Sequence, residues 1–165
     1  AGIVLGVCCS IVAQLWRGSR PHVAVVGRVP DTHYFRNTKR HLVEIEPHLL
    51  ALRIDENIFF ANTKAVEQAI SQALAEYPDT REVLLILSAV NHIDSTGLDM
   101  LSELTEGLKE RDIGLHLAEV KGPVMDQLQH TDWIGRQIGQ VFPSTDIAFN
   151  TLGKVANRAP EHSGE

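Results

Sequence analysis

Apolar and polar positions follow one another along the chain in blocks that predict strands and helices in turn. The short apolar runs that predict β-strands cover residues 22–26, 49–54, 82–88, 114–120 and 141–142. Apolar positions at helical spacing predict helices over residues 62–77, 95–111, 122–130 and 144–158. Because strands and helices alternate from the second strand onward, the pattern predicts an α/β fold with one mostly parallel sheet and helices packed on it.

Three local features refine this prediction. The run at residues 82–88 is the most apolar and shows no alternation, which indicates burial on both faces at the centre of the sheet. Residues 27–46 are polar and are predicted to form a loop, with one short strand near Leu42-Val43. Asn62 or Thr63 is expected to cap the helix that follows.

The beginning of the chain differs in character from the rest. Residues 1–16 carry no charge, and Arg17 and Arg20 follow directly. This stretch is slightly shorter than the roughly 20 apolar residues of a full membrane span, and no basic residues precede it as in a signal peptide. We therefore expect residues 1–17 to be the end of a transmembrane helix that begins before this sequence, with Trp16 at the interface. The alternative is a buried helix packed on the domain.

Composition narrows the possible classes of function. The chain has 165 residues, 44% hydrophobic and 22% charged, which fits one globular domain with a core. The formal net charge of −6 and the scattered Lys and Arg residues argue against nucleic-acid binding. Cys8 and Cys9 are adjacent, so they cannot form an ordinary structural disulfide. We expect a cytoplasmic domain over residues 18–158 and a flexible tail over residues 159–165.

No sequence motif indicates an enzyme. The chain contains neither of the common glycine-rich phosphate cradles and no Gly-x-Ser-x-Gly elbow. It also has no pair of histidines at i, i+4 on a predicted helix, so no metal or other cofactor is expected. His92, two residues before Asp94, could be half of a metal site, but its partners are missing and we interpret it as a turn residue.

The polar turn at residues 90–97 is the strongest candidate for a functional site. It connects the most apolar strand to a helix N-terminus, where free N–H groups and the helix dipole favour anions. One reading is that Asp94 or Ser95 simply caps the helix. The other is that Ser95 or Thr96 is phosphorylated, which would add a dianion that the dipole stabilises and that repels an acidic partner.

Three segments, taken in order, identify a resemblance that covers about residues 1–155. Ile93-Asp94-Ser95-Thr96-Gly97-Leu98 resembles the Asp-Ser-Ser/Thr-Gly turn of STAS domains, which are named for sulphate transporters and anti-sigma factor antagonists. Residues 19–30 resemble the segment in which SulP-family anion transporters leave their last membrane helix and enter the STAS domain. Leu52-Arg53-Ile54-Asp55, followed by Ile58-Phe59-Phe60-Ala61-Asn62, is similar to the same family.

The resemblance implies a mixed, mostly parallel sheet of about four to six strands, with about four to five helices packed mainly on one face. It also implies a cytoplasmic regulatory domain of a secondary-active transporter in the inner (plasma) membrane, for sulphate, bicarbonate or dicarboxylates. The implied switch turn is Asp94, Ser95, Thr96 and Gly97, and the implied partner or anion-binding surface is His92, Leu98 and Asp99. Thr96 occupies the position that a partner kinase phosphorylates in stand-alone anti-sigma factor antagonists.

The resemblance further implies several partners. They are the membrane part of the same transporter, a second copy in a transporter homodimer, and a nucleotide or acyl carrier protein bound near the turn. The acidic side chains of Glu103, Glu106 and Glu110 on the following helix do not favour an acidic acyl carrier protein. The alternative function is that of a stand-alone soluble antagonist, which would have no use for the uncharged leader.

Overall fold

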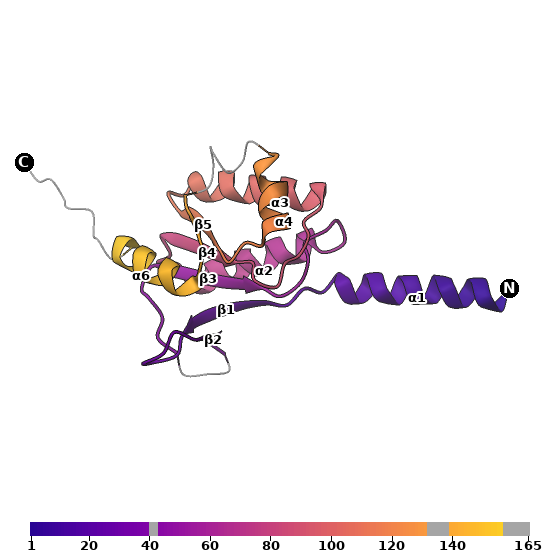
Figure 1. The fold of residues 1–165 in the computed structure, drawn as a ribbon, viewed down its shortest axis with the longest axis horizontal. Coiled ribbons are helices and arrows are strands. Elements are labelled where there is room, and N and C mark those ends of the chain that lie inside the picture. Colours follow the sequence, from indigo (N-terminus) through magenta and orange to yellow (C-terminus); the bar gives the residue numbers. More distant parts are fainter. Residues whose placement is uncertain (40–42, 132–138, 157–165) are drawn as a thin grey trace, which may run out of the picture.

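The protein is described by a computed structural model covering residues 1–39, 43–131 and 139–156. A long helix, α1 (Gly2–Gly18), projects from an α/β domain built on a single sheet (Figure 1). The strands are β1 (Val23–Arg28), β2 (Phe35–Asn37), β3 (Leu49–Ile54), β4 (Glu82–Ile86), β5 (Gly114–Ala118) and β6 (Val141–Phe142). Their order in the sheet is β2-β1-β3-β4-β5-β6. Strands β3 to β6 run parallel, whereas β1 is antiparallel to both β2 and β3.

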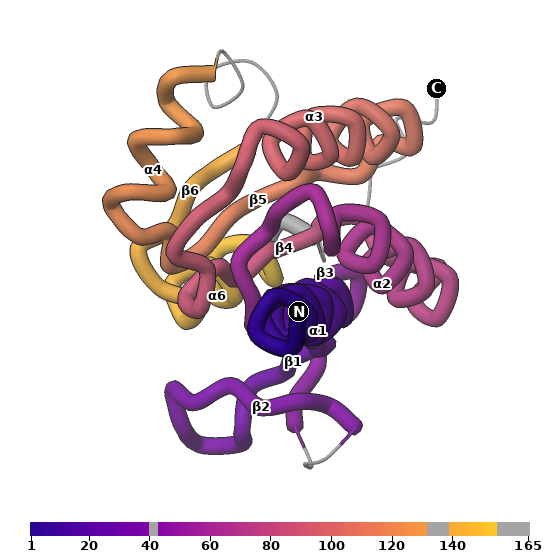
Figure 2. The backbone as a smooth tube through the Cα atoms, turned by 90° about the vertical axis from the view of Figure 1, so that its right-hand side faces the viewer, coloured from indigo at the N-terminus to yellow at the C-terminus, as the bar shows by residue number. Residues whose placement is uncertain are grey.

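The helices cover the two faces of the sheet unequally (Figure 2). Helices α2 (Thr63–Glu76), α3 (Ser95–Lys109) and α4 (Gly122–Gln129) pack on one face and share its larger apolar core. Helix α6 (Thr145–Ala156) packs on the other face and closes a smaller core. The predicted fold is thereby confirmed: a mixed, mostly parallel sheet with helices mainly on one side.

The central strand β4 is buried on both faces because its side chains from Val83 to Ile86 are all apolar. In β4, Val83 and Leu85 enter the larger core, whereas Leu84 and Ile86 enter the smaller one. All four are at most 2% exposed. Successive side chains on a strand point to opposite faces, so an unbroken apolar run is what a doubly covered strand requires. The interpretation of residues 82–88 as the sheet centre was correct.

The predicted loop at residues 27–46 was wrong in part, because it contains β2, an edge strand paired with β1. The strand has three residues and includes the polar pair Arg36-Asn37, so it has no apolar periodicity to reveal it. Of the strand predicted near Leu42-Val43, residue 42 lies outside the described residues and Val43 is not in a strand. Glu44, next along, forms an isolated antiparallel bridge with Arg28. The predicted tail at residues 159–165 also lies outside the described residues.

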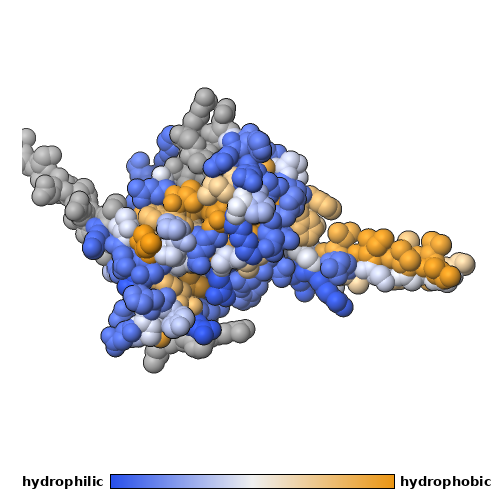
Figure 3. Space-filling view, in the orientation of Figure 1, coloured by the Kyte–Doolittle hydropathy of each residue, from blue (hydrophilic) through white to orange (hydrophobic). Residues whose placement is uncertain are grey.

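Helix α1 contains no buried residue (Figure 3), and Ile3 at its start is 85% exposed. The alternative of a buried helix packed on the domain was therefore wrong. None of the helices in the described ranges combines the length and apolar character needed to cross a membrane. The interpretation of residues 1–17 as the end of a membrane helix stays a prediction.

Helix α6 is fixed to the antiparallel edge of the sheet by Arg28 at the end of β1. Its Nη2 donates hydrogen bonds to Asp146 Oδ1 (2.9 Å) and Asn150 Oδ1 (2.8 Å) on α6. The guanidinium also lies over the rings of Phe35 and Phe149, 5.6 and 5.8 Å from their centroids. One side chain thus joins β1, β2 and α6 by charge and by cation–π contact.

Replacing Phe149 by alanine should destabilise the domain strongly, because α6 supplies the helical cover of the smaller core. Phe149 is 2% exposed, and a buried Phe→Ala change typically costs about 3–5 kcal/mol. Ile147, also on α6, is 47% exposed, so Ile147→Ala should change the unfolding free energy by less than about 1 kcal/mol. Urea denaturation of both variants measures the difference, and equal losses would contradict this description of α6.

Candidate functional site

The predicted turn lies where the chain leaves the parallel strands at their carboxyl ends. Two connections run side by side there: residues 55–62, after β3, and residues 87–94, after β4. Ile58 and Ile93 form a parallel bridge between them, and both are fully buried. Ile58 N donates to His92 O (3.2 Å), and Asp94 N donates to Ile58 O (3.1 Å). The turn is therefore an extension of the sheet and not a free loop.

Asp94 joins these two connections through its carboxylate. It caps α3 by accepting a hydrogen bond at Oδ1 from Gly97 N (2.8 Å). Its other oxygen, Oδ2, accepts from Phe60 N (2.9 Å) in the neighbouring connection. Each oxygen serves a different segment, so only a carboxylate satisfies both N–H groups. Asp94, and not Ser95, is the cap of this helix.

Gly97 allows the close packing beneath the turn. A Cβ at this position would lie 2.7 Å from Ile93 Cγ2 and 3.0 Å from Ile58 Cγ2. Those distances are shorter than carbon–carbon contacts permit, so any larger residue would push the turn away from the neighbouring connection. The glycine of the motif is explained here by packing.

The other predicted site residues differ in their exposure. Ser95 and Thr96 are both exposed at the first turn of α3, so their hydroxyls are accessible. Asp99 is exposed too, whereas Leu98 is half-buried and packs against the larger core. Leu98 therefore contributes mainly to packing. The roles assigned to these residues in binding or switching stay predictions.

His92 is directed toward α4 and not toward a set of metal ligands. Its Nδ1 lies 3.2 Å from Nε2 of Gln127, whose Oε1 accepts from Ile93 N (3.2 Å). Within the described ranges, no three His, Cys, Asp or Glu side chains are grouped so that they could hold a metal ion. The geometry fits the interpretation of His92 as a turn residue.

Polar residues that the sequence pattern did not indicate also support the turn. Asn57 Oδ1 accepts from Asn91 N (2.7 Å) and His92 N (3.2 Å). Lys121, before α4, donates from Nζ to Asn91 Oδ1 (2.6 Å). Asn62 precedes α2 but makes no capping hydrogen bond, and its fully buried amide bonds to backbone groups instead. Asn57 and Asn62 lie on either side of the apolar residues Ile58-Phe59-Phe60. This placement was the one sequence feature that could have indicated their supporting role.

A charged cluster near the same end joins the start of β1 to the end of β3. Arg53 Nε donates to Asp55 Oδ1 (2.6 Å), and His22 Nδ1 lies 2.6 Å from Asp55 Oδ2. Partial burial by itself would raise the pKa of Asp55, but the hydrogen bonds and charges of Arg53 and His22 outweigh burial and lower it below its ordinary value. The pKa of Arg53 is raised, chiefly by its hydrogen bond to Asp55.

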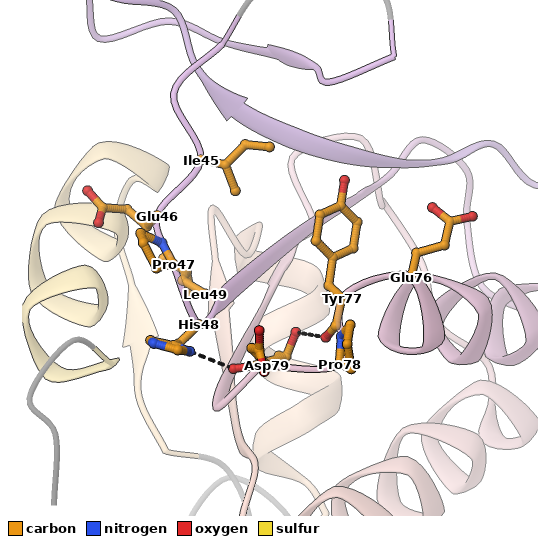
Figure 4. Close-up of a pocket in the computed structure, with 10 residues that line it drawn as sticks. Ile45, Glu46, Pro47, His48, Leu49, Glu76, Tyr77, Pro78 and Asp79 are labelled. Atoms are coloured by element: carbon orange, nitrogen blue, oxygen red, sulfur yellow. Dashed lines mark hydrogen bonds between the residues drawn. The ribbon is translucent and has the colours of Figure 1, made fainter.

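A separate pocket of about 260 Å³ lies at the opposite end of the sheet, at the amino ends of β3 and β4 (Figure 4). It is lined by residues 45–49 and 76–80. His48, with a left-handed φ of 69°, places Nδ1 2.7 Å from Asp79 O, and Thr80 Oγ1 donates to Tyr77 O (2.7 Å). The first contact joins the two loops, and the second closes the turn within residues 76–80. None of the predicted site residues lines this pocket.

The chain belongs to the STAS domain family, whose sequence pattern matches residues 41–148. Sulfate transporter 3.1 of Arabidopsis thaliana is 31% identical to it, over an alignment that covers 93% of this chain and 24% of the transporter. High affinity sulfate transporter 2 of Stylosanthes hamata is 29% identical, over 92% of this chain and 25% of the transporter. The chain thus spans about a quarter of the length of these relatives. They are named as transporters and not as enzymes, which at this coarse level supports the prediction of a non-enzymatic domain.

Solved structures share the fold at lower sequence identity. The murine Solute Carrier 26 family member A9 (Slc26a9) anion transporter in the inward-facing state matches with a TM-score of 0.82 and 18% identity, over 93% of this chain and 25% of that one. The SulP transporter STAS domain from Vibrio cholerae matches with a TM-score of 0.56 and 20% identity, over 72% of this chain and 91% of that one. A putative anti-sigma factor antagonist from Thermotoga maritima matches with a TM-score of 0.57 and 16% identity, over 66% of this chain and 91% of that one.

Asp94→Asn should destabilise the domain by about 1–2 kcal/mol, because an amide has one acceptor oxygen and its NH₂ group would face an N–H donor. Asp99→Asn is the matched control, since it removes the same charge from the same helix at an exposed position and should stay within about 0.5 kcal/mol of the wild type. Thermal or urea unfolding measures both. Equal losses of stability in the two variants would show that the negative charge near the start of α3, and not the two hydrogen bonds, accounts for the contribution of Asp94 to stability.

The stability lost on replacing Asp55 by asparagine should depend on pH. Because the native pKa of Asp55 is lowered from 3.8, its contribution is present above that ordinary value and is lost as the pH falls through the native pKa. The difference in unfolding free energy between wild type and Asp55→Asn should therefore be largest above about pH 5 and shrink below about pH 4. Glu56→Gln controls for the change in net charge. A difference that grows on acidification would contradict this assignment.

Proposed function

We propose that this chain is the cytoplasmic, C-terminal regulatory part of a SulP-family secondary-active anion transporter in the plasma membrane. The anion class is sulphate, bicarbonate or a dicarboxylate. The sulphate transporters that match nearly the whole chain support this proposal, as does the STAS fold. The transport site itself would lie in the membrane part, so no residue of this chain is assigned as a ligand of the transported anion.

The observation that carries the proposal is the exposed apolar surface of α1. Residues 2–16 of the helix are uncharged, and no residue of the helix is buried. Its apolar side chains face outward, since Ile3, Val4 and Leu5 are each at least 67% exposed. A large contiguous apolar surface marks a protein or membrane contact. We assign that contact to lipid and to the membrane part of the same transporter, with α1 as the end of its last membrane helix.

The end of α1 nearest the domain has the chemistry of a membrane interface. Trp16 is 62% exposed, and the guanidinium of Arg20 lies 4.5 Å from the centroid of its indole ring. Arg17 lies in the last turn of the helix. Tryptophan at the interface, with arginines immediately beyond it, is the arrangement expected on the cytoplasmic side of a membrane helix.

The regulatory element in this proposal is the Asp94–Gly97 turn. Ser95 and Thr96 present hydroxyls on the surface at a helix N-terminus, where a modifying phosphate or a partner's anionic group would be stabilised. The same exposure suits a stand-alone phospho-switch protein, which is the alternative function. The apolar surface of α1 favours the transporter, because a soluble switch protein gains nothing from it.

The finer partner assignments belong to the same proposal. Glu103, Glu106 and Glu110 are exposed on and just after α3, so their charge opposes docking of an acidic acyl carrier protein beside the turn. A nucleotide phosphate would find N–H donors at the start of α3, although Asp94 already caps that helix. Homodimerisation is expected through the complete transporter.

Thr96→Glu in the full-length protein should lower sulphate uptake by about fivefold or more, the lower end of typical coupling between sites. The added carboxylate lies beside Asp94 at the start of α3 and competes for the same N–H groups. Thr151→Glu, an exposed threonine on α6, is the matched control and should leave uptake unchanged. Radiolabelled uptake, with bicarbonate and dicarboxylates as competitors, measures both variants.

Immunoblots of washed membranes and of the soluble fraction test whether the chain is part of a membrane transporter. A soluble product of about 18 kDa would contradict the transporter and favour the stand-alone switch protein.

A further inference from the structure

Asn62 holds the last residue of α1, although it lies outside the predicted switch turn. Its Nδ2 donates to Gly18 O (3.2 Å) and to Asn57 O (2.7 Å), and its Oδ1 accepts from Phe59 N (3.0 Å). The side chain is fully buried. Only an amide can donate to two carbonyls and accept from an N–H at once, so neither aspartate nor leucine reproduces these bonds.

Packing reinforces this contact at the same residue. A Cβ on Gly18 would lie 2.9 Å from Cζ of Phe59, so the ring occupies the space that a side chain would need. Gly18 is half-buried, and the rest of α1 is exposed. The direction of this long helix relative to the sheet therefore depends on what holds its domain end, and the connection after β3 supplies both a hydrogen bond and a ring contact there.

The same connection is bonded at Phe60 to the turn, because Phe60 N donates to Asp94 Oδ2 (2.9 Å). A continuous path therefore runs from Asp94 to Phe60, through the peptide bond to Phe59, and from Phe59 through Asn62 to Gly18. We propose that this path is a relay that sets the direction of α1 according to the state of the Asp94–Gly97 turn. Asn62 is its positioning residue.

Electrostatics provides the means of switching. The carboxylate of Asp94 accepts from Gly97 N and Phe60 N, and a second anion at Thr96 would compete for the first N–H groups of α3 and repel that carboxylate. Loss of the bond to Phe60 frees the connection that Asn62 holds against α1. The link between α1 and transport rests on the proposed function, whereas the relay itself is a property of this chain.

Distances between spin labels on α1 and on the domain test the relay in the 165-residue chain, held in detergent micelles. One label is attached to Cys8 with Cys9 replaced by serine, and the other to Ser71→Cys on the exposed side of α2. We expect the unmodified relay to give one narrow distance distribution. Asp94→Asn, Asn62→Asp and Gly18→Ala should each shift or broaden it. Gly6→Ala is the matched control, because nothing lies within 4 Å of its Cβ position.

The combination of variants separates a relay from independent structural effects. Asp94→Asn should add nothing in the Asn62→Asp background, because both act through the same contacts. Additive changes, or an unchanged distribution in a folded Asp94→Asn chain, would overturn the relay and leave the transporter assignment intact. Circular dichroism establishes folding, and if Asn62→Asp unfolds, the pair of Asp94→Asn and Gly18→Ala provides the same comparison. The proposed function is tested separately in the full-length wild-type protein, where normal membrane insertion without anion uptake would count against it.

Discussion

The carboxylate of Asp94 is the interaction on which the carboxyl end of the sheet depends. Its two oxygens accept from N–H groups that belong to different connections, one starting α3 and one following β3. Both connections leave the carboxyl ends of the parallel strands β3 and β4. Apart from the bridge at Ile58 and Ile93, their backbone groups need partners that the strands do not supply. A single side chain therefore satisfies two such donors and fixes the spacing of the loops. Gly97 makes this geometry possible by letting α3 begin in contact with Ile58 and Ile93.

This dependence explains why the turn is both bonded to the neighbouring connection and exposed. Ile58 and Ile93 are fully buried beneath it, whereas Ser95 and Thr96 lie on the surface directly above. A modification at either hydroxyl therefore meets a preorganised set of N–H groups and does not have to order a loop first. Such a modification would act on the hydrogen bonds that Asp94 already makes, and one of these bonds leads to Phe60 in the connection after β3.

The sequence predicted the central part of the fold well, because its physical determinants are local. An unbroken apolar run identified β4, and helical periodicity identified α2 and α3. The edge strand β2 was missed because Phe35-Arg36-Asn37 owes its conformation to pairing with β1 and not to its own pattern. Asp94 was predicted as a cap, but its bond to Phe60, 34 positions away in the sequence, could not be read from spacing.

Asn62 shows most clearly what local sequence patterns cannot predict. An asparagine before a helix is read as a cap, since that is its commonest local role. Here the side chain turns away from the N–H groups of α2 and satisfies backbone groups of the preceding connection and of α1, 44 positions earlier. Burying an amide without partners would be costly, so its full burial requires that these bonds are kept. The side chain that bonds to the end of α1 is thus polar, and the apolar surface of α1 stays exposed.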